Sequence, residues 1–154
     1  MAPAIKKVRK GRKPQRHKDR YVLEAQVGFV LRKASQRHAA IFARAMIDQI
    51  TPTQWAALVK LREVGASSQN RLGRETAMDI ATIKGVVDRL LARGLIKTSQ
   101  DLEDGRRVTI RLTDAGARAV EKGVPIARRI TEQTVRGLKA AERAALMKLL
   151  QKIS

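Results

Sequence analysis

Apolar side chains recur at every third or fourth position in the segments at both ends of the chain, a spacing that places them on one face of an α-helix. The first segment runs from Tyr21 to about Met46 and would span on the order of 36 Å as a helix. That length exceeds the reach of a small domain, so part of this face is expected to pack on a partner. A homodimer with C2 symmetry, whose first and last helices cover each other, is the simplest solution. The apolar positions are Leu23, Val27, Val30, Leu31, Ala34, Ile41, Phe42 and Ala45 in the first segment and Leu146, Leu149, Leu150 and Ile153 in the last.

A second helix is predicted to begin at Thr51-Pro52-Thr53-Gln54. Thr51 can cap the helix, Pro52 suits its first position, and Gln54 completes a capping box. Trp55, Leu58, Val59 and Leu61 give this helix an apolar side. The tryptophan is interpreted first as a core residue and alternatively as a ligand contact.

The stretch from Ser67 to Thr113 predicts a short helix, a turn, a longer helix and two strands joined by a charged hairpin. Ser67 or Ser68 caps the short helix, which is expected to continue through Thr76. Asp79 caps the longer helix, Ile80 to Arg93, and Gly94 stops it. This order of elements is that of a winged helix-turn-helix, a DNA-binding motif.

The longer helix has two different faces when its residues are placed at 100° intervals. Gly85 lies on the outward face, although a mid-helix glycine costs about 1 kcal/mol relative to alanine. It therefore indicates that something bulky comes close: either the base-pair edges of a DNA major groove or a neighbouring helix. The inward face is predicted to hold Ile80, Ile83, Val86, Val87, Leu90 and Leu91, and the outward face Ala81, Thr82, Gly85, Asp88, Arg89 and Ala92, with Lys84 at the margin.

Two strands are predicted after this helix. Leu95 and Ile96 open the first, and Val108, Ile110 and Leu112 alternate with polar residues in the second. The hairpin tip between them, residues 101–107, is interpreted either as a solvated loop or as a wing. In the second case Arg106 and Arg107 enter a DNA minor groove while Asp104 fixes a guanidinium through a charge-assisted pair.

These patterns predict a mainly α fold with a small β-hairpin wing, built as a winged helix-turn-helix domain plus N- and C-terminal dimerisation helices. The DNA-binding region is residues 51–113, and the dimerisation helices lie in residues 21–50 and 114–154. Within the last range Thr113 caps a further long helix that Pro125 is expected to bend.

The charge of the chain favours a polyanionic partner. Lys and Arg number 33 against 14 Asp and Glu, for a net charge of +19. Residues 1–20 contribute +8 of this and contain few apolar residues, so they are predicted to form a flexible basic arm, which leaves +11 on the remainder. The arm is interpreted as a phosphate-tracking or minor-groove contact, with a merely solvated tail as the alternative.

Several function classes are disfavoured. The chain has no cysteine and only two histidines, so thiolate zinc sites and thiol nucleophiles are excluded, and no cofactor or metal is expected. No nucleophile and base pair or phosphate-binding loop is recognisable, so an enzyme is not expected. No apolar run reaches the roughly 18 residues that span a bilayer, and the protein is predicted to be cytoplasmic. His38 lies on the apolar face of the first helix, as a locally satisfied core residue or as a group that lines a ligand cavity or dimer seam.

Residues from about Thr51 to Gly116 resemble the MarR family of bacterial transcription regulators, and the likeness extends over nearly all of the chain after residue 20. The wing pattern, Asp-x-Arg followed by Leu-Thr-x-x-Gly, is its most specific part. The motifs that carry the resemblance are Thr51-Pro52-Thr53-Gln54-Trp55, Ser68-Gln69-Asn70-Arg71-Leu72-Gly73, Val87-Asp88-Arg89-Leu90, Arg93-Gly94-Leu95, Asp104-Gly105-Arg106-Arg107 and Leu112-Thr113-Asp114-Ala115-Gly116.

The resemblance implies a homodimer that places its two recognition helices in successive major grooves of a pseudopalindromic operator, with Arg106 in a minor groove. Family members commonly repress a nearby operon and release the DNA when a small molecule binds between the dimerisation and DNA-binding regions. Carried onto this sequence, the implied DNA contacts are Ser68, Gln69, Asn70, Ala81, Thr82, Lys84, Arg89, Arg106 and Arg107.

The resemblance further implies a small-molecule effector, an aromatic acid or its CoA thioester. Arg37, His38, Phe42 and Trp55 are the candidate lining residues, although the same residues also suit a plain core. The leading interpretation is thus a ligand-responsive repressor that binds double-stranded DNA. The alternative is a nucleoid-type protein that coats DNA without sequence choice, which the net charge of +19 favours.

Overall fold

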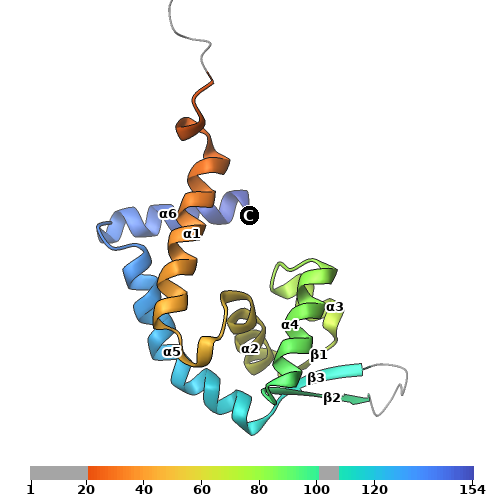
Figure 1. Cartoon of the computed structure of the whole chain (residues 1–154). Coiled ribbons are helices and arrows are strands. Elements are labelled where there is room, and N and C mark those ends of the chain that lie inside the picture. Colours follow the sequence, from red (N-terminus) through yellow and green to blue (C-terminus); the bar gives the residue numbers. More distant parts are fainter. Residues whose placement is uncertain (1–20, 101–107) are drawn as a thin grey trace, which may run out of the picture.

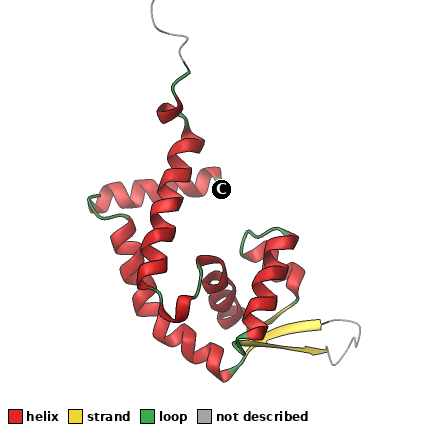
Figure 2. Ribbon diagram, viewed as in Figure 1, coloured by secondary structure: helices red, strands yellow, loops and turns green. Residues whose placement is uncertain are grey.

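The computed structural model describes residues 21–100 and 108–154. Helices α1, α5 and α6 lie on one side, and α2, α3, α4 and the sheet lie on the other (Figure 1). The strands sit together at one end of the molecule (Figure 2). In chain order the elements are η1 (Leu23–Ala25), α1 (Val27–Ala45), η2 (Ile47–Gln49), α2 (Pro52–Val64), β1 (Ala66–Ser67), α3 (Gln69–Glu75), α4 (Ile80–Ala92), β2 (Ile96–Gln100), β3 (Val108–Leu112), α5 (Asp114–Thr134) and α6 (Ala140–Ile153).

The first helix is shorter than the sequence predicts. A separate 3-10 turn covers Leu23–Ala25, and Gln26 is extended with φ −84° and ψ 129°, so α1 begins only at Val27. Along α1 only Phe42 is buried, so most of its predicted apolar face is open in the single chain.

The turn that leads from α1 into α2 is conformationally strained. Asp48 and Gln49 have φ values of 51° and 53°, in the left-handed region that costs an L-residue roughly 1–2 kcal/mol. Arg93, just after α4, donates from Nη2 to the carbonyl oxygen of Asp48 at 2.6 Å. A charge-assisted hydrogen bond thus holds this turn against the end of α4.

The capping box at the start of α2 is confirmed. The backbone N–H of Gln54 donates to Thr51 Oγ1 at 3.3 Å, and the backbone N–H of Thr51 donates to Gln54 Oε1 at 3.0 Å. Leu58 and Leu61 then point into the core, where both are buried. This helix therefore starts where its local sequence chemistry requires.

The helix-turn-helix is also confirmed, with small changes at its ends. Ser68, not Ser67, caps α3, because the N–H of Arg71 donates to Ser68 Oγ at 3.4 Å, and α3 ends at Glu75. Asp79 Oδ1 accepts from the N–H of Thr82 at 2.7 Å and caps α4, which ends at Ala92. Gly94 follows with φ 66°, which suits glycine.

The predicted inward face of α4 is confirmed except at the first residue of the helix. Ile83, Val86, Val87 and Leu90 are buried, and Leu91 is half-buried, but Ile80 is 77% exposed. The prediction for Ile80 is wrong because helical periodicity gives a side chain's direction without showing whether a neighbouring element reaches that far along the helix. At the first residue of α4 none of the described elements covers it.

The sheet has three antiparallel strands in the order β1-β3-β2, whereas the sequence predicts two. The additional strand, β1, pairs Ser67 with Ile110 of β3. It has only two residues, too few for an alternating pattern to be visible. Strand β2 begins at Ile96, which pairs with Leu112, so Leu95 lies just outside it.

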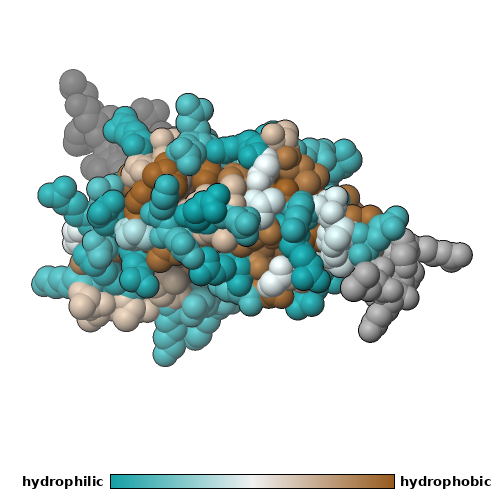
Figure 3. Space-filling model, turned by 90° about the horizontal axis from the view of Figure 1, so that it is seen from below, coloured by the Kyte–Doolittle hydropathy of each residue, from teal (hydrophilic) through white to brown (hydrophobic). Residues whose placement is uncertain are grey.

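The core lies between α2, α4, the sheet and α5. Thr113 caps α5 by accepting from the N–H of Gly116 at 3.1 Å. Pro125 lies inside this helix without ending it, and the ribbon of α5 bends in Figure 1. Seen from below, hydrophilic side chains cover most of the surface with smaller hydrophobic patches between them (Figure 3). The largest fully buried side chains are Ile50, Leu58, Leu61, Leu72, Ile83, Leu90, Ile110, Ile130 and Val86.

Candidate nucleic-acid interface and effector cavity

Helix α3 lies close to the start of α4. Gly73 permits this, because a Cβ atom there would approach Ile83 Cγ2 of α4 to 3.1 Å. Ser68 and Asn70 are exposed at the start of α3, and Gln69 between them is half-buried. Asn70 shares a hollow of about 330 Å³ with Asp79 and Ile80 at the start of α4. The predicted contacts of both helices therefore belong to one surface.

The outward face of α4 carries exposed side chains of Ala81, Thr82, Lys84 and Arg89. Thr82 Oγ1 donates to Asp79 Oδ2 at 3.0 Å, so the capping carboxylate also orients the threonine. The N–H of Thr82, which donates to the same carboxylate, lowers the pKa of Asp79. The face thus presents an oriented hydroxyl and two basic side chains.

Charge pairs on this surface leave a positive excess. Lys84 Nζ lies 3.1 Å from Asp88 Oδ2, and Arg71 Nε donates to Glu75 Oε1 at 2.6 Å. The Arg71 hydrogen bond lowers the pKa of Glu75. All four side chains are partly or largely exposed, so solvent screens both pairs and each cation can exchange its carboxylate for a phosphate contact.

Among residues 21–100 and 108–154, no second helix packs on Gly85. Apart from its chain neighbours and the backbone of α4, the described atoms within 4 Å of a Cβ placed there are the guanidinium Nη2 of Arg89, at 3.1 Å, and its Cζ. The hypothesis that Gly85 serves helix–helix packing is therefore wrong for the described chain. The surface above Gly85 is open except for one flexible side chain.

The wing residues Asp104, Arg106 and Arg107 lie outside the described residues. The strands that lead to them are paired as far as Gln100 and Val108. Ser99 Oγ and Thr109 Oγ1 form a hydrogen bond of 2.9 Å near that end.

A second site, which we call the helix cavity, lies between α1, α5 and α6 and has a volume of about 470 Å³. This volume falls in the range of small-molecule sites. Its polar groups include Arg37 and His38 from α1, Thr134 from α5 and Arg136 just beyond it. The full lining is Val30, Leu31, Ala34, Arg37, His38, Thr131, Thr134, Val135, Arg136, Leu138, Leu146, Met147 and Leu150.

The hydrogen bonds of His38 define which of its nitrogens is free. Thr134 Oγ1 donates its one proton to the carbonyl oxygen of Ile130 at 2.8 Å. Its contact with His38 Nδ1, at 2.9 Å, is therefore one in which the histidine donates. In the neutral ring Nε2 is then the acceptor. His38 is thus half-buried, hydrogen-bonded to Thr134 and part of the lining of the helix cavity, and its role toward a ligand stays a prediction.

The four candidate effector residues are only partly brought together. Arg37 and His38 line the helix cavity. Phe42 is buried beside His38, with ring centroids 5.9 Å apart, but does not line it. Trp55 is half-buried in α2, and its indole packs on Gly123 of α5, where a Cβ atom would overlap the ring.

Residues that the sequence reasoning missed in the helix cavity come from the end of α5. Thr131 and Thr134 are polar positions one turn apart on this helix, following an apolar face that includes Ala127. Polar residues that interrupt an apolar helical face are a signal of a cavity, and Arg136 two residues later adds a second cation.

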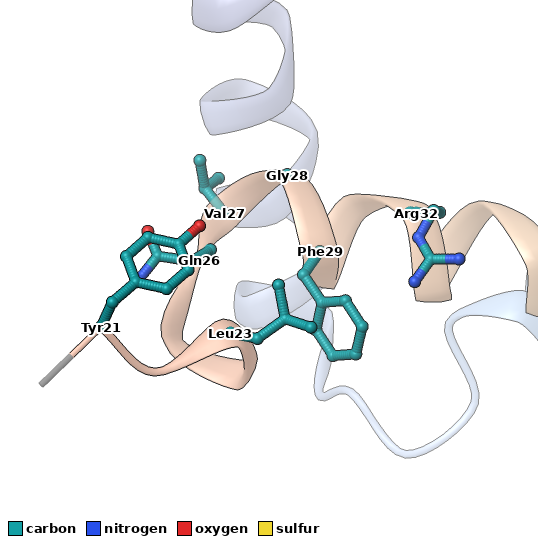
Figure 4. Close-up of a pocket in the computed structure, with 7 residues that line it drawn as sticks. All are labelled: Tyr21, Leu23, Gln26, Val27, Gly28, Phe29 and Arg32. Atoms are coloured by element: carbon teal, nitrogen blue, oxygen red, sulfur yellow. The ribbon is translucent and has the colours of Figure 1, made fainter.

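A smaller hollow of about 430 Å³ lies where η1 leads into α1. Figure 4 shows its residues along this turn, with Arg32 one helical turn beyond the others. The guanidinium carbon of Arg32 lies 5.3 Å from the centroid of Phe29. Tyr21, Leu23 and Val27 are exposed here, which extends the open apolar face of α1.

Two other types of site are absent from the part of the chain that the structure describes. It contains no group of three or more His, Cys, Asp or Glu side chains that would hold a metal ion. None of its helices is both long and apolar enough to cross a membrane.

Similar proteins are found over most of the chain. The transcriptional repressor NicR of Pseudomonas putida is 46% identical over 134 residues, which are 86% of this chain and 85% of NicR. A probable transcriptional regulator from Pseudomonas aeruginosa has a crystal structure with 50% identity and a TM-score of 0.84, covering 86% of this chain and all of that one. Bordetella bronchiseptica BpsR, whose DNA binding is regulated by 6-hydroxynicotinic acid, gives 43% identity and a TM-score of 0.83 over 87% and 96% of the two chains.

The family assignment follows from these matches and from the winged helix-turn-helix. The model of the MarR family matches residues 50–108, from just before α2 to the first residue of β3. With the identity to NicR over most of both chains, the chain belongs to the MarR family, whose members are transcription regulators that bind DNA and are not enzymes.

Proposed function

We propose that this protein is a homodimeric repressor that binds a pseudopalindromic operator and is released from it by a small aromatic acid. The observation that carries the proposal is the pairing, in one short chain, of an exposed polar and basic reading face on α3 and α4 with a separate helix cavity that contains two arginines.

The reading face supports the DNA part of the proposal. Ala81 has a small side chain and Gly85 has none, so the backbone of α4 can approach a major groove closely. Thr82, Lys84 and Arg89 offer donors to bases or phosphates, and Ser68, Gln69 and Asn70 add donors from α3. Arg106 and Arg107 of the wing supply the minor-groove contact, which Asp104 orients.

The outer helices support the homodimer. α6 has no buried residue, and Leu149 and Ile153 on its apolar face are 60% and 66% exposed. The face of α1 from Val27 to Leu31 is similarly open. A second copy that covers these faces also fixes the distance between two reading faces, as a pseudopalindrome requires.

The helix cavity supports an aromatic acid as effector. Arg37 and Arg136 are cations for a carboxylate, His38 Nε2 is an acceptor for a ring hydroxyl, and Leu31 and Leu150 are apolar surfaces for the ring. The relative BpsR responds to 6-hydroxynicotinic acid, which combines these groups. A CoA thioester would have to extend out of a cavity of about 470 Å³.

The test measures release of the protein from its operator, obtained by selection from a random duplex pool. 6-Hydroxynicotinic acid, benzoic acid and an aromatic CoA thioester are titrated separately. Replacing Arg37 by Gln should raise the acid concentration needed for release about tenfold, which corresponds to the 1.4 kcal/mol expected of a charge-assisted hydrogen bond. Arg44→Gln removes the same charge from the same helix outside the helix cavity and should leave release unchanged. Release that Arg37→Gln does not alter would contradict the effector site.

The alternative, a nucleoid-type protein that coats DNA, rests on the net charge of +19. Titration of operator and random duplexes at several salt concentrations separates the two functions. A repressor should prefer the operator by roughly 10³-fold or more, whereas a coating protein gives equal affinities. Deleting residues 1–20, which carry +8, should flatten the salt dependence if the arm contacts phosphates.

A further inference from the structure

Ile80 is an apolar side chain in an unusual place. Among the described residues, eleven large hydrophobic side chains are exposed, and nine of them lie in the segment from Tyr21 to Leu31 or on α6. The other two are Ile80, 77% exposed, and Val108, 54% exposed. Ile80 lies on α4, across the molecule from α1 and α6 (Figure 1). Dimerisation through the outer helices therefore does not account for its exposure.

The hollow beside Ile80, of about 330 Å³, has both apolar and polar walls. Met78 and Ile83 form its apolar part, and Asn70, Arg74 and Asp79 form its polar part. Lys84 is exposed one turn further along α4. A polyanion is the partner that this charge attracts, but an isoleucine gains nothing from a phosphate. For Ile80 to make a favourable contact, the charged partner must also present an apolar group at this point.

We propose that Ile80 is a specificity-determining residue that packs against the C5-methyl group of a thymine in each operator half-site. The inference rests on the proposed function. Thymine is the one DNA base whose major-groove edge carries a methyl group, and apolar side chains recognise it there. In a helix-turn-helix the N-terminal residues of the recognition helix are those that reach base edges, and Ile80 is the first residue of α4.

The size of the effect follows from the chemistry of one methyl group. Burying one such group contributes about 0.8 kcal/mol, which corresponds to about a fourfold change in affinity. Replacing the thymine by deoxyuridine removes only this methyl group and keeps every base-pairing atom. A symmetric replacement in both half-sites should therefore weaken binding by about 15-fold, as the product of two fourfold losses.

The experiment replaces each thymine of the selected operator by deoxyuridine, symmetrically in the two half-sites, one position at a time. Affinities are measured for the wild type, Ile80→Ala, Ile80→Val and Val108→Ala. We expect one thymine position at which loss of the methyl group weakens operator binding by the wild type about 15-fold. At the same position the operator affinity of Ile80→Ala should not change. Ile80→Val should keep most of the preference, and Val108→Ala, which trims the other isolated exposed hydrophobic side chain, should keep all of it.

Two results would overturn the inference, and they are distinguishable. If deoxyuridine has the same effect on the wild type and on Ile80→Ala at every position, the methyl contact does not exist although the operator does. If operator and random duplexes bind equally, the proposed function fails and the inference fails with it. Because Ile80 is exposed, Ile80→Ala should fold normally, and an unchanged melting temperature checks this.

Discussion

The region from α2 to β3 and the outer helices α1 and α6 use their apolar residues in opposite ways. α2 and α4, each 13 residues long, bury four side chains apiece, and their starts are fixed by capping side chains. α1 buries only Phe42 over 19 residues, and α6 buries none over 14. The reading region is therefore organised by a buried core, whereas the outer helices leave an exposed apolar face, which the second copy of the proposed homodimer would cover. Changes in the two regions should consequently have separable effects on folding, dimerisation and DNA binding.

The largest expected effect comes from placing a charge on the open face of α6. In Leu149→Glu the carboxylate would be buried without a partner in the dimer, at a cost of roughly 3–5 kcal/mol. We expect monomers by sedimentation velocity and a loss of operator affinity of at least about 100-fold. Gln151→Glu, which adds the same charge at an exposed polar position of α6, should remain dimeric. A Leu149→Glu protein that is still a dimer would show that the exposed apolar face of α6 does not form the dimer interface.

The next effect concerns the wing and leaves the outer helices untouched. Arg106→Ala should weaken operator binding by about 1–3 kcal/mol because a minor-groove contact is lost. Sedimentation velocity should still give a dimer. Lys148→Ala removes an equal charge from α6, and we expect its operator affinity to stay near that of the wild type. If Arg106→Ala binds the operator normally, the wing plays no part in recognition.

The sequence predicts local features of the reading region well. Thr51, Asp79 and Thr113 all cap the helices expected, because a cap depends on residues within one turn of it. The prediction that Ile80 lies on the inward face is wrong because the burial of a side chain depends on which element packs against it. Strand β1 was missed for a related reason, since two residues form a strand only when β3 is beside them.

The same division applies to the candidate sites. Arg37 and His38 are consecutive residues of α1, so their closeness follows from the sequence, whereas the tertiary structure is needed to show that both line the helix cavity. Trp55 is a candidate only through the effector that the family resemblance implies, and its packing on Gly123 depends on how α2 and α5 meet. Thr134 and Arg136 come from a segment almost a hundred residues away, and only the tertiary structure brings them to His38.

A smaller effect distinguishes stability from binding within the reading region. Gly85→Ala should stabilise the protein by up to about 1 kcal/mol, because glycine is unfavourable inside a helix and only the flexible Arg89 guanidinium must move. It should nevertheless weaken operator binding by about 1 kcal/mol, because the new methyl group obstructs the DNA. Melting temperature and operator affinity would thus change in opposite directions.

Gly28→Ala is the matched control for this prediction. Gly28 lies in α1, and a Cβ atom there meets nothing within 4 Å. Because residues 27–31 belong to the face proposed for dimerisation, sedimentation velocity first checks that the variant is a dimer. As a dimer it should have a higher melting temperature than the wild type and an unchanged operator affinity. If Gly85→Ala also leaves affinity unchanged, the recognition helix does not approach DNA closely at this point.

The smallest effect is a pH dependence of the reading region through Asp79. Hydrogen bonds from Thr82 lower the pKa of Asp79 in the folded protein below the ordinary value of an aspartate, so folding favours the ionised form. The stabilisation is therefore complete above the unfolded-state pKa and is lost as the pH falls through the folded-state pKa. Asp79→Asn, which keeps a capping oxygen without the charge, should be less stable than the wild type at neutral pH. The difference should shrink toward zero below the folded-state pKa, as measured by denaturant unfolding of the two proteins across the acid range. A difference that is constant with pH would mean that the charge of Asp79 does not stabilise the start of α4, and that the cap acts through its hydrogen-bond geometry alone.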